Sequence, residues 1–400
     1  MPAKGKGKPK KNQHQLCKLL PPGEVLTDLQ KKTWNVQHLI RSNGYGLIYL
    51  ADKVSEYSEK DNAPYVIKVR PHENGPLFCE ISFYQRAARS DQIETWKKRT
   101  KVPFLGVPSY IAHGLHERNK EKLRFLVMPR FGSDLHNLWL KAGKKFKRET
   151  VAKIAIMMLD ALHYMHEKEY VHADIKGANI LCGYTNSNKL YLVNYSSAYR
   201  YMVDNSHKKY MTDPKNAHNG TIEYTSTDAH EGANPSRRGD MEILGFFLVH
   251  LLCGRLPWED KLSDCAYVRD AKINALDDVK KFVRDTCKNG NLSEIVEFLQ
   301  FVVGLDYYEE PDYKKLQNIF KTTLKSMGIS LSSPLDFSVV DEDIELPTTK
   351  KSRRAESVTK TVSTEEKRTQ RVMRTSEEST SSSSDEKDDR RCHHSNDEFF

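Results

Sequence analysis

The alternation of apolar and polar residues divides the chain into two regions with different predicted secondary structure. Between about residues 35 and 128, short runs rich in β-branched and aromatic residues show period-two stretches, which predicts a small antiparallel sheet. One helix, at about Pro76 to Ala88, is expected to interrupt this sheet. The four runs are WNVQHLI, GLIYLA, YVIKVR and LRFLVM.

From about residue 134 onward the pattern becomes helical. Within residues 151–166, apolar side chains recur at helical spacing on one stripe. A further helix is predicted over 240–253, where the run ILGFFLVHLLC indicates a buried helix, and more helices follow to about residue 326. The pattern therefore predicts an α+β architecture, with a β-rich lobe joined to an α-helical lobe around a cleft. The stripe residues are Val151, Ile154, Met158, Leu162 and Met165.

The two ends of the chain differ in composition from this core. Residues 1–20 form a basic arm without the apolar residues needed to fold, and from about residue 345 to residue 400 the chain is polar, charged and Ser/Thr-rich, which predicts disorder. The net charge of +9 hints at acidic partners such as nucleic acid or chromatin, although solvated faces explain the excess more simply.

The seven cysteines are scattered and include no C-x-x-C pair. Because several of them lie inside apolar runs, we expect buried free thiols in a reducing compartment. The N-terminus lacks the apolar core of a secretory signal, and no stretch is long and apolar enough to cross a membrane. We therefore expect an intracellular, monomeric protein.

Two charged residues stand out in the sheet region. Lys68 lies in the middle of the apolar strand YVIKVR, where a lysine is costly unless its ammonium group meets a partner. Glu80 follows in the predicted helix, and a strand lysine paired with a helix glutamate can orient the lysine toward the α- and β-phosphates of a nucleotide. Taken alone, Lys68 is explained more simply as a surface lysine on an edge strand.

A second polar group follows the long helix, in the stretch HADIKGAN. Asp174 can accept the proton of a substrate hydroxyl, and Lys176 can neutralise charge on the moving phosphoryl group. Asn179 can hold a metal through its side-chain oxygen. The spacing H-x-D-x-K-x-x-N, downstream of a strand lysine and a helix glutamate, is specific enough to indicate phosphoryl transfer.

These motifs resemble those of the eukaryotic protein kinases over about residues 35–326. Within the kinases, the chain is similar to the vaccinia-related kinase family of the casein-kinase branch. The resemblance implies a bilobal kinase fold, with an N-lobe over about 35–128 and a C-lobe over about 132–326. It also implies a C-terminal extension at 327–344 that packs on the domain. The matching stretches are NGPLFCEISFYQRA, RFGSDL, EYVHADIKGAN, YTSTDAH, PSRRGDMEILG, LPWED and DFSVV.

The resemblance also assigns roles to individual residues. Asp174 would be the catalytic base, with Lys176 on the γ-phosphate and Thr221 steadying the base. Asn179 and Asn194 would occupy the positions that hold Mg²⁺. The implied contacts for ATP are Ile40, Ile48, Lys68, Glu80, Met128 and Phe131.

The chain departs from the kinase pattern where phosphate and metal bind. In the loop IRSNGYGLIY, Arg41 and Asn43 occupy the first two positions of G-x-G-x-x-G. Asn43 tolerates left-handed geometry at a cost of about 1 kcal/mol or less. Arg41 is bulkier and would sit over the nucleotide, where it would either lend charge to a phosphate or crowd the site.

The other departures are Asn194 and Ser196, which stand where kinases have D-F/Y-G. Asn194 offers magnesium a neutral oxygen, whereas this ion prefers charged ligands, and Ser196 removes the conformational freedom of glycine. Magnesium binding should therefore be weak or absent and transfer should fall by orders of magnitude, while ATP binding could survive. Ala173 replaces the arginine of many kinases, which fits a family that does not rely on a phosphorylated activation loop.

Three functions remain open. The favoured hypothesis is a vaccinia-related-kinase-like pseudokinase, with impaired or absent transfer, that acts by binding a protein partner. The first alternative is an active serine/threonine kinase that transfers the γ-phosphate of ATP to protein. The second is a chromatin- or nucleic-acid-binding scaffold, motivated by the five lysines between Lys4 and Lys11 and by the cluster KKSRR at 350–354. Both clusters also resemble nuclear-import signals, so the nucleus is favoured over the cytoplasm.

Overall fold

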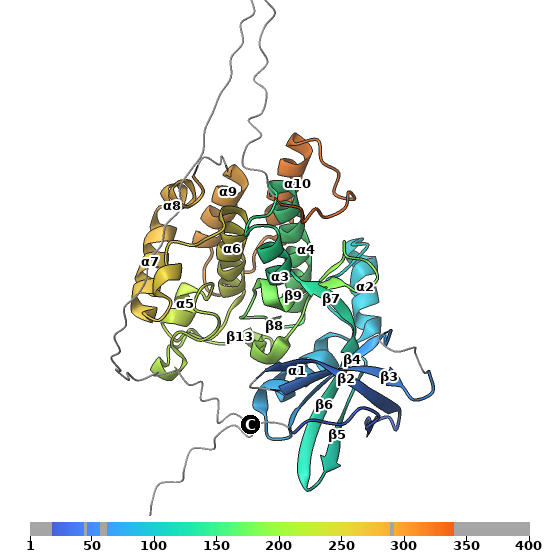
Figure 1. Cartoon of the computed structure of the whole chain (residues 1–400). Coiled ribbons are helices and arrows are strands. Elements are labelled where there is room, and N and C mark those ends of the chain that lie inside the picture. The colour runs from blue at the N-terminus through green and yellow to red at the C-terminus, as the bar shows by residue number, and fades with distance from the viewer. Residues whose placement is uncertain (1–17, 44–45, 57–61, 289–291, 340–400) are drawn as a thin grey trace, which may run out of the picture. The chain divides into compact units, whose positions relative to one another are not determined.

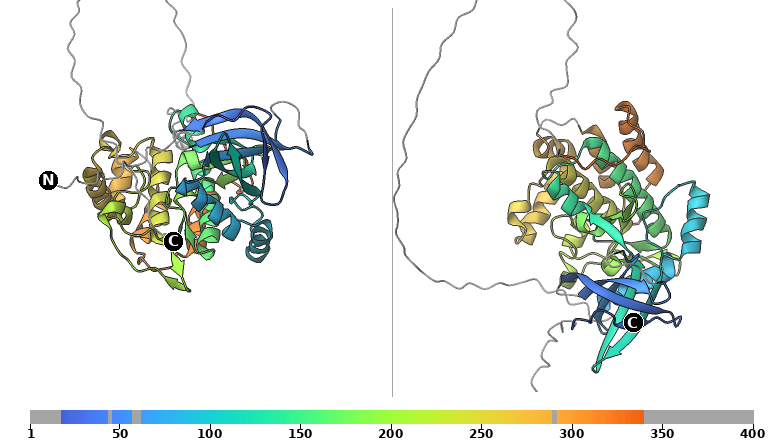
Figure 2. Two further views of the ribbon diagram at one scale, coloured as in Figure 1. Left: turned by 90° about the horizontal axis from the view of Figure 1, so that it is seen from below. Right: turned by 45° about the vertical axis from the view of Figure 1, so that its right-hand side comes forward.

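The computed structural model describes residues 18–43, 46–56, 62–288 and 292–339, which all belong to the compact unit Met1–Val340. A β-rich N-lobe is followed by a mainly helical C-lobe (Figure 1). The views in Figure 2 show the N-lobe strands, in blue, gathered on one side of the helices. The predicted α+β arrangement is confirmed. Apart from residues 18–20, both segments expected to be disordered lie outside the described residues.

The N-lobe is built on a six-stranded antiparallel sheet with strand order β1-β2-β3-β4-β6-β5. All four predicted runs lie in its strands. The sheet begins earlier than residue 35, because β1 precedes it and Leu20 and Leu26 are buried in its core. Strand β1 was not predicted, because a strand of three residues is too short to show an alternation of apolar and polar positions. The strands are β1 (Val25–Thr27), β2 (Thr33–Asn43), β3 (Gly46–Lys53), β4 (Tyr65–Pro71), β5 (Ala112–Arg118) and β6 (Glu121–Pro129).

The alternation of side chains along β4 determines where Lys68 points. Ile67 and Val69 belong to the core of the N-lobe sheet, whereas Val66 belongs to the larger core that continues through α1 into the C-lobe. Successive side chains of a strand face opposite sides of the sheet. Lys68 therefore lies on the face of Val66, toward α1 and the C-lobe.

Two helices, rather than the single predicted one, interrupt the sheet between β4 and β5. Helix α1 (Gly75–Ala87) begins at the cap residue Asn74, with a proline in its first turn. Helix α2 (Ser90–Thr100) was missed because only Ile93 and Trp96 of its eleven residues are buried, which leaves little periodicity to detect.

The C-lobe is organised around α4 (Arg148–Glu167) and α6 (Arg237–Cys253). All five predicted stripe residues of α4 are buried, and α6 is buried on nearly all sides. Helix α6 begins three residues earlier than predicted because the Ser236 hydroxyl caps it by accepting from the Gly239 N–H at 3.1 Å. Within the described residues, no helix has the length and apolar character needed to span a bilayer.

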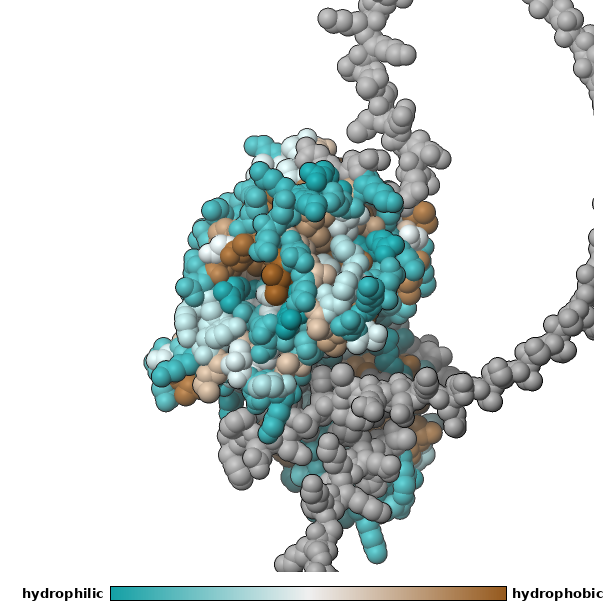
Figure 3. Space-filling model, turned by 90° about the vertical axis from the view of Figure 1, so that its left-hand side faces the viewer, coloured by the Kyte–Doolittle hydropathy of each residue, from teal (hydrophilic) through white to brown (hydrophobic). Residues whose placement is uncertain are grey.

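Shorter elements complete the C-lobe. Its outer face around α7 and α8 is largely hydrophilic, with a small hydrophobic area (Figure 3). The other helices are α3 (Leu135–Lys141), α5 (Thr227–His230), α7 (Cys265–Asp277), α8 (Val279–Thr286), α9 (Ser293–Val303) and α10 (Tyr313–Ser326). The short strands are β7 (Phe131–Asp134), β8 (Tyr170–Val171), β9 (Ile180–Gly183), β10 (Leu190–Leu192), β11 (Tyr199–Arg200), β12 (Met202–Val203) and β13 (Ser206–His207).

The expectation of free thiols throughout is wrong for one pair of cysteines. Cys253, at the end of α6, and Cys287, directly after α8, form a disulfide with their Cα atoms 4.9 Å apart. The two residues are 34 positions apart in the sequence, so only the packing of α8 against the end of α6 brings them together. Cys79 and Cys182 are free thiols, and burial raises the pKa of Cys182 to about 11.

The chain after α10 runs back over the C-lobe as a C-terminal strap, residues 329–339. The ammonium group of Lys153 donates to the carbonyls of Ser333 at 3.0 Å and Pro334 at 3.2 Å. The Lys147 ammonium lies 2.6 Å from the Asp336 carboxylate. This ion pair holds the pKa of Asp336 down, at about 2. The strap is thus fastened to the start of α4 by two lysines.

Replacing Lys153 with methionine should detach this part of the strap. The substitution removes the donors of several carbonyl and hydroxyl contacts, so we expect the free energy of unfolding to fall by about 1–3 kcal/mol. Urea denaturation of the full chain measures this. The matched control is Lys98→Met on the exposed side of α2, which should change stability by less than about 0.5 kcal/mol. Equal effects of the two substitutions would contradict the assignment.

Candidate active site

Lys68 and Glu80 form a buried ion pair between β4 and α1. The Lys68 Nζ lies 2.5 Å from the Glu80 Oε2, and the two side chains are 9% and 1% exposed. Burial lowers the pKa of Lys68, and the Glu80 carboxylate opposes this effect. The Lys68 ammonium also lies 3.3 Å from Oδ1 of Asn194 in the C-lobe. The lysine therefore joins the two lobes at the position where the sequence predicts a nucleotide phosphate.

The loop after β8 is held by a buried carboxylate at the start of α6. Asp240 accepts the backbone N–H groups of His172 at 2.7 Å and Ala173 at 2.8 Å. Its carboxylate also lies 2.9 Å from Nε2 of His166. Ala173 has a φ of 61°, a left-handed conformation that costs an L-residue about 1–2 kcal/mol. The bonds to Asp240 hold the loop in this strained form and so place Asp174.

The loop brings the predicted catalytic residues together. The Asp174 Oδ1 accepts from the Thr221 hydroxyl at 2.6 Å, and its Oδ2 lies 3.0 Å from the Lys176 Nζ. Lys176 also donates to the Thr221 hydroxyl at 2.7 Å. The Asn179 amide donates to Asp174 Oδ2 at 3.0 Å. The carboxylate of Asp174 is thus held by two neutral donors and one cation.

The corner at Asn194 continues this network toward Lys68. The Asn194 amide donates to Oδ1 of Asn179 at 3.1 Å, and its own Oδ1 accepts from the Ser196 hydroxyl at 3.0 Å. Asn194 has a φ of 68°, a conformation that asparagine tolerates better than most residues. Hydrogen bonds therefore run without interruption from Glu80 through Lys68, Asn194 and Asn179 to Asp174.

Tyr195 fixes this corner against the N-lobe. Its ring stacks on Phe83 of α1 with centroids 3.9 Å apart and meets Tyr84 edge-on at 5.2 Å. The Tyr195 hydroxyl donates to the carbonyl of Leu192 at 2.6 Å. Burial raises the pKa of Tyr195 well above its usual value. The helix that carries Glu80 and the segment that carries Asn194 are therefore packed as one unit.

The residues expected to contact the nucleotide base lie on four strands, β2, β3, β6 and β7. Met128 is buried, with its sulfur 3.6 Å from the Tyr84 hydroxyl, and Phe131 begins β7 with its ring 4.9 Å from Tyr191. Ile48 is partly buried against the main core. Ile40, on β2, is 47% exposed, and its contact with ATP stays a prediction.

Arg41 reaches across from the N-lobe to the C-lobe. Its Nη2 lies 3.5 Å from Oδ2 of Asp134, the buried residue that caps α3. The expectation that Arg41 lies over the nucleotide position is therefore refined, because its charge is directed to a carboxylate at the start of α3. The side chain of Asn43 lies outside the described residues.

The donor set at Asn179 and Asn194 does not fit a dedicated Mg²⁺ site. Protein kinases as a class use ATP with Mg²⁺, and this ion prefers carboxylate oxygens. Here both side chains are neutral, and both amide oxygens already accept hydrogen bonds inside the protein. The Asn194 amide therefore competes with a metal for the oxygen of Asn179.

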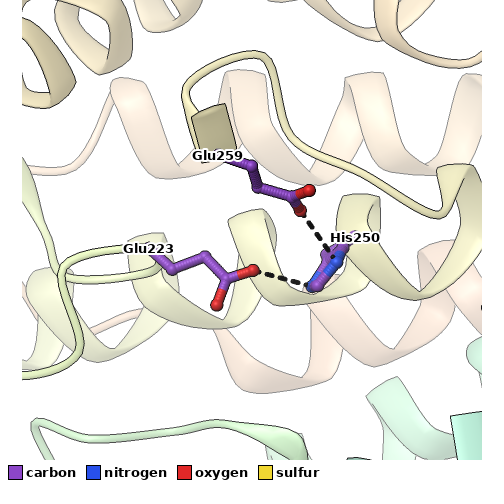
Figure 4. Close-up of side chains that lie close together, drawn as sticks. All are labelled: Glu223, His250 and Glu259. Atoms are coloured by element: carbon purple, nitrogen blue, oxygen red, sulfur yellow. Dashed lines mark ion pairs between the residues drawn. The ribbon is translucent and has the colours of Figure 1, made fainter. Parts of the chain in front are cut away.

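A second cluster of ionisable side chains includes Glu223, two residues after Thr221 in the sequence (Figure 4). His250 of α6 is placed between two carboxylates, with Nδ1 3.4 Å from Glu223 and Nε2 2.9 Å from Glu259. One imidazole and two carboxylates could bind a divalent metal, but the carboxylates face opposite nitrogens, as Figure 4 shows. The arrangement instead ties Glu223 and Glu259 to α6.

Two important site residues were not assigned a role from the sequence. Asp240 was recognised only as the opening of a buried helix, although a carboxylate in an otherwise apolar helix signals a buried partner. Asp134 was seen only inside the stretch RFGSDL. Its contact with Arg41 spans 93 positions and left no local signal.

Comparison with known proteins agrees with this geometry. The chain matches the protein kinase domain family over residues 109–318. It is 44% identical over 342 residues to the human serine/threonine-protein kinase VRK2, covering 85% of this chain and 66% of that protein. It is 39% identical to nucleosomal histone kinase 1 of Drosophila melanogaster, covering 84% of this chain and 56% of that protein. The chain thus spans less than two thirds of the length of each. It is also 33% identical over 325 residues to the mouse serine/threonine-protein kinase VRK3, covering 80% of this chain and 71% of that protein.

A solved structure is also similar. The structure of vaccinia related kinase 3 aligns with a TM-score of 0.71 and 29% identity, covering 81% of this chain and 98% of that one. At this identity and coverage the likeness extends to the whole of both lobes rather than to a single motif.

Asp240→Asn should destabilise the loop before Asp174. An amide offers one acceptor oxygen where the carboxylate offers two, so at least one buried N–H of His172 or Ala173 loses its partner. We expect a loss of about 3 kcal/mol in the free energy of unfolding, measured by chemical denaturation. Asp260→Asn, on an exposed aspartate, is the control and should cost less than about 0.5 kcal/mol. A loss below about 1 kcal/mol in the first variant would contradict this role of Asp240.

Proposed function

We infer the function from one premise: this chain belongs to the vaccinia-related kinase family of serine/threonine protein kinases. We propose that it is a pseudokinase-like member of that family. It binds ATP through Lys68, Met128 and the hinge at Phe131, transfers phosphate at a greatly reduced rate, and acts mainly by binding a protein partner.

One observation carries this proposal, the hydrogen bond between the amides of Asn194 and Asn179. In protein kinases an aspartate at the first of these positions binds the metal that neutralises the phosphates. Here the Asn194 amide instead occupies the oxygen of Asn179, while Lys68 and Ser196 occupy the oxygen of Asn194. Phosphoryl transfer depends mainly on positioning and on charge neutralisation. Without the carboxylate, the metal is bound less well, and the charge of the transferring phosphates is then neutralised less well.

The second candidate function, an active serine/threonine kinase, has its own support. The bonds around Asp174 provide a positioned base, with Thr221 and Lys176 in contact with its carboxylate. The pair of Lys68 and Glu80 is also closed. These groups could support slow transfer if a metal bound through the nucleotide phosphates alone.

The partner is proposed to be a basic, chromatin-associated protein in the nucleus. The support is the name of a relative, which is a nucleosomal histone kinase, together with the basic clusters near the two ends of the chain. Those clusters lie outside the described residues, and they also motivate the third candidate, a nucleic-acid-binding scaffold.

Asn194→Asp should restore transfer. The change returns one carboxylate to the corner, and we expect labelled phosphate to move from ATP to histone about 100-fold faster than in the wild type, with Mg²⁺ or Mn²⁺. Ser196→Gly alone, which adds no charge, should leave the rate within about threefold. Wild-type turnover equal to that of Asn194→Asp, and abolished by Asp174→Ala, would establish the active-kinase alternative.

Binding of ATP should not require a metal. We expect ATP to raise the unfolding temperature equally with Mg²⁺ and with a chelator, because the proposed contacts of ATP, with Lys68, Met128 and the hinge at Phe131, involve no metal. Lys68→Met should abolish the shift. A shift that appears only with Mg²⁺ would show that a metal does bind at this corner.

A further inference from the structure

A fully buried lysine lies beneath the turn that carries Thr221. Lys272 lies on α7, on the side of the lobe whose outer surface is largely hydrophilic (Figure 3), yet its own exposure is 0%. Its ammonium group donates to the carbonyls of Ile222 at 2.8 Å and Thr225 at 2.7 Å. The third contact, at 3.2 Å, is Nε2 of His230. All three N–H groups of this lysine therefore point at residues 222–230.

Burying the charged ammonium group of Lys272 costs free energy, so its hydrogen bonds to residues 222–230 are needed to offset that cost. Burial lowers the pKa of Lys272 to about 7, although the Glu242 carboxylate opposes the shift. Burial also raises the pKa of Glu242 to about 7. A buried ammonium is tolerated only where its hydrogen bonds are satisfied, and here two of the three acceptors are backbone carbonyls of one turn.

Other buried groups hold the same turn. The Glu242 carboxylate accepts the Thr227 N–H at 2.7 Å and its hydroxyl at 3.1 Å. His250 lies against Glu223, as Figure 4 shows. The segment Gly220–Asp228, which we name the substrate turn, is therefore fixed at residues 222, 223, 225 and 227 by side chains of α6 and α7.

The substrate turn is coupled directly to the catalytic residues. Thr221, its second residue, donates to the Asp174 carboxylate at 2.6 Å. Gly220 has a φ of 98°, and a Cβ at this position would meet the Thr225 hydroxyl at 2.8 Å, so the turn closes tightly on itself. Any movement of residues 222–225 would therefore also move Thr221.

In many kinases a corresponding segment is ordered by phosphorylation, when a phosphate pairs with arginines. Here Ala173 precedes Asp174 and offers no guanidinium group. Two cations of this chain already contact the turn: the Arg238 guanidinium pairs with Asp228 at 2.7 Å, and the buried ammonium of Lys272 occupies two backbone carbonyls.

We propose that Lys272 is a positioning residue that holds the substrate turn preformed, so that the protein-binding surface does not depend on phosphorylation of this chain. The binding role of the turn comes from the kinase resemblance, because Gly220–Asp228 stands where kinases carry their substrate-binding loop, and it therefore rests on the proposed function. The ordering of the turn by Lys272 does not, because it can be measured without nucleotide or partner.

The test is hydrogen exchange of the full chain by mass spectrometry. For Lys272→Met we expect amides of residues 220–228 to exchange about tenfold faster or more, while amides of α4 keep their protection. Wild-type protein treated with phosphatase should match untreated protein. Lys281→Met, an exposed lysine on α8, is the matched control and should leave the turn unchanged.

Three results would overturn the proposal: unchanged exchange in the turn, equal acceleration in α4, which marks a merely structural role, or release of the wild-type turn by phosphatase. Should Lys272→Met fail to fold, Lys272→Gln keeps an uncharged NH₂ group with two N–H donors and should show an intermediate acceleration confined to the turn.

A kinetic readout addresses function separately. In the Asn194→Asp background, Lys272→Met should raise KM for histone about fivefold or more with KM for ATP unchanged. If that background shows no transfer, the proposed function fails while the exchange result still decides the role of Lys272. If transfer occurs and both KM values change together, Lys272 does not act through the substrate turn.

Discussion

The geometry of the site depends on one buried carboxylate. Asp240 takes two consecutive backbone N–H groups, of His172 and Ala173, and holds the second residue in a left-handed conformation. Without these bonds nothing in the loop itself would favour that shape, because alanine prefers other regions of backbone space. The positions of Asp174 and Asn179, and through them Thr221 and Asn194, follow from this anchor. Helix α6 is therefore the fixed body from which the site is built.

A second constraint links the lobes. The stack of Tyr195 on Phe83 and the contact of Lys68 with Asn194 connect α1 to the segment after β10. The Ser196 hydroxyl adds a bond to Asn194 where a glycine would add none. These contacts involve uncharged groups except for Lys68, so they need no phosphate or metal to form. The corner is thus closed by its own side chains.

The sequence predicted most of this arrangement because the relevant signals are local. Lys68 interrupts an apolar strand, Glu80 follows on a helix face, and the residues from Asp174 to Asn179 lie in one short stretch. Period two and period 3.6 then located the strands and the main helices. The features that escaped prediction leave no such trace. Helix α2 buries two residues, and β1 has three in all.

Contacts between segments far apart in the sequence also could not be predicted from local patterns. The disulfide of Cys253 with Cys287, and the pairing of Arg41 with Asp134, are set by how whole elements pack. No role was predicted for Lys272 from the sequence, since a single charged residue on an amphipathic helix usually faces water. Its burial follows from the position of α7 beneath the substrate turn, which no local pattern encodes.

The choice of asparagine at position 194 has a chemical consequence of its own. Side-chain amides are thermolabile, and hydrolysis of this amide yields the aspartate that kinases carry at the same position. Spontaneous deamidation of Asn194 would therefore give the protein a metal-binding carboxylate at this position. Transfer that increases as a sample ages or is heated would point to that deamidated minority, whereas transfer by fresh protein belongs to the chain as synthesised. Each rate measured on this protein should therefore be accompanied by a mass measurement that shows how much of the Asn194 amide has been hydrolysed.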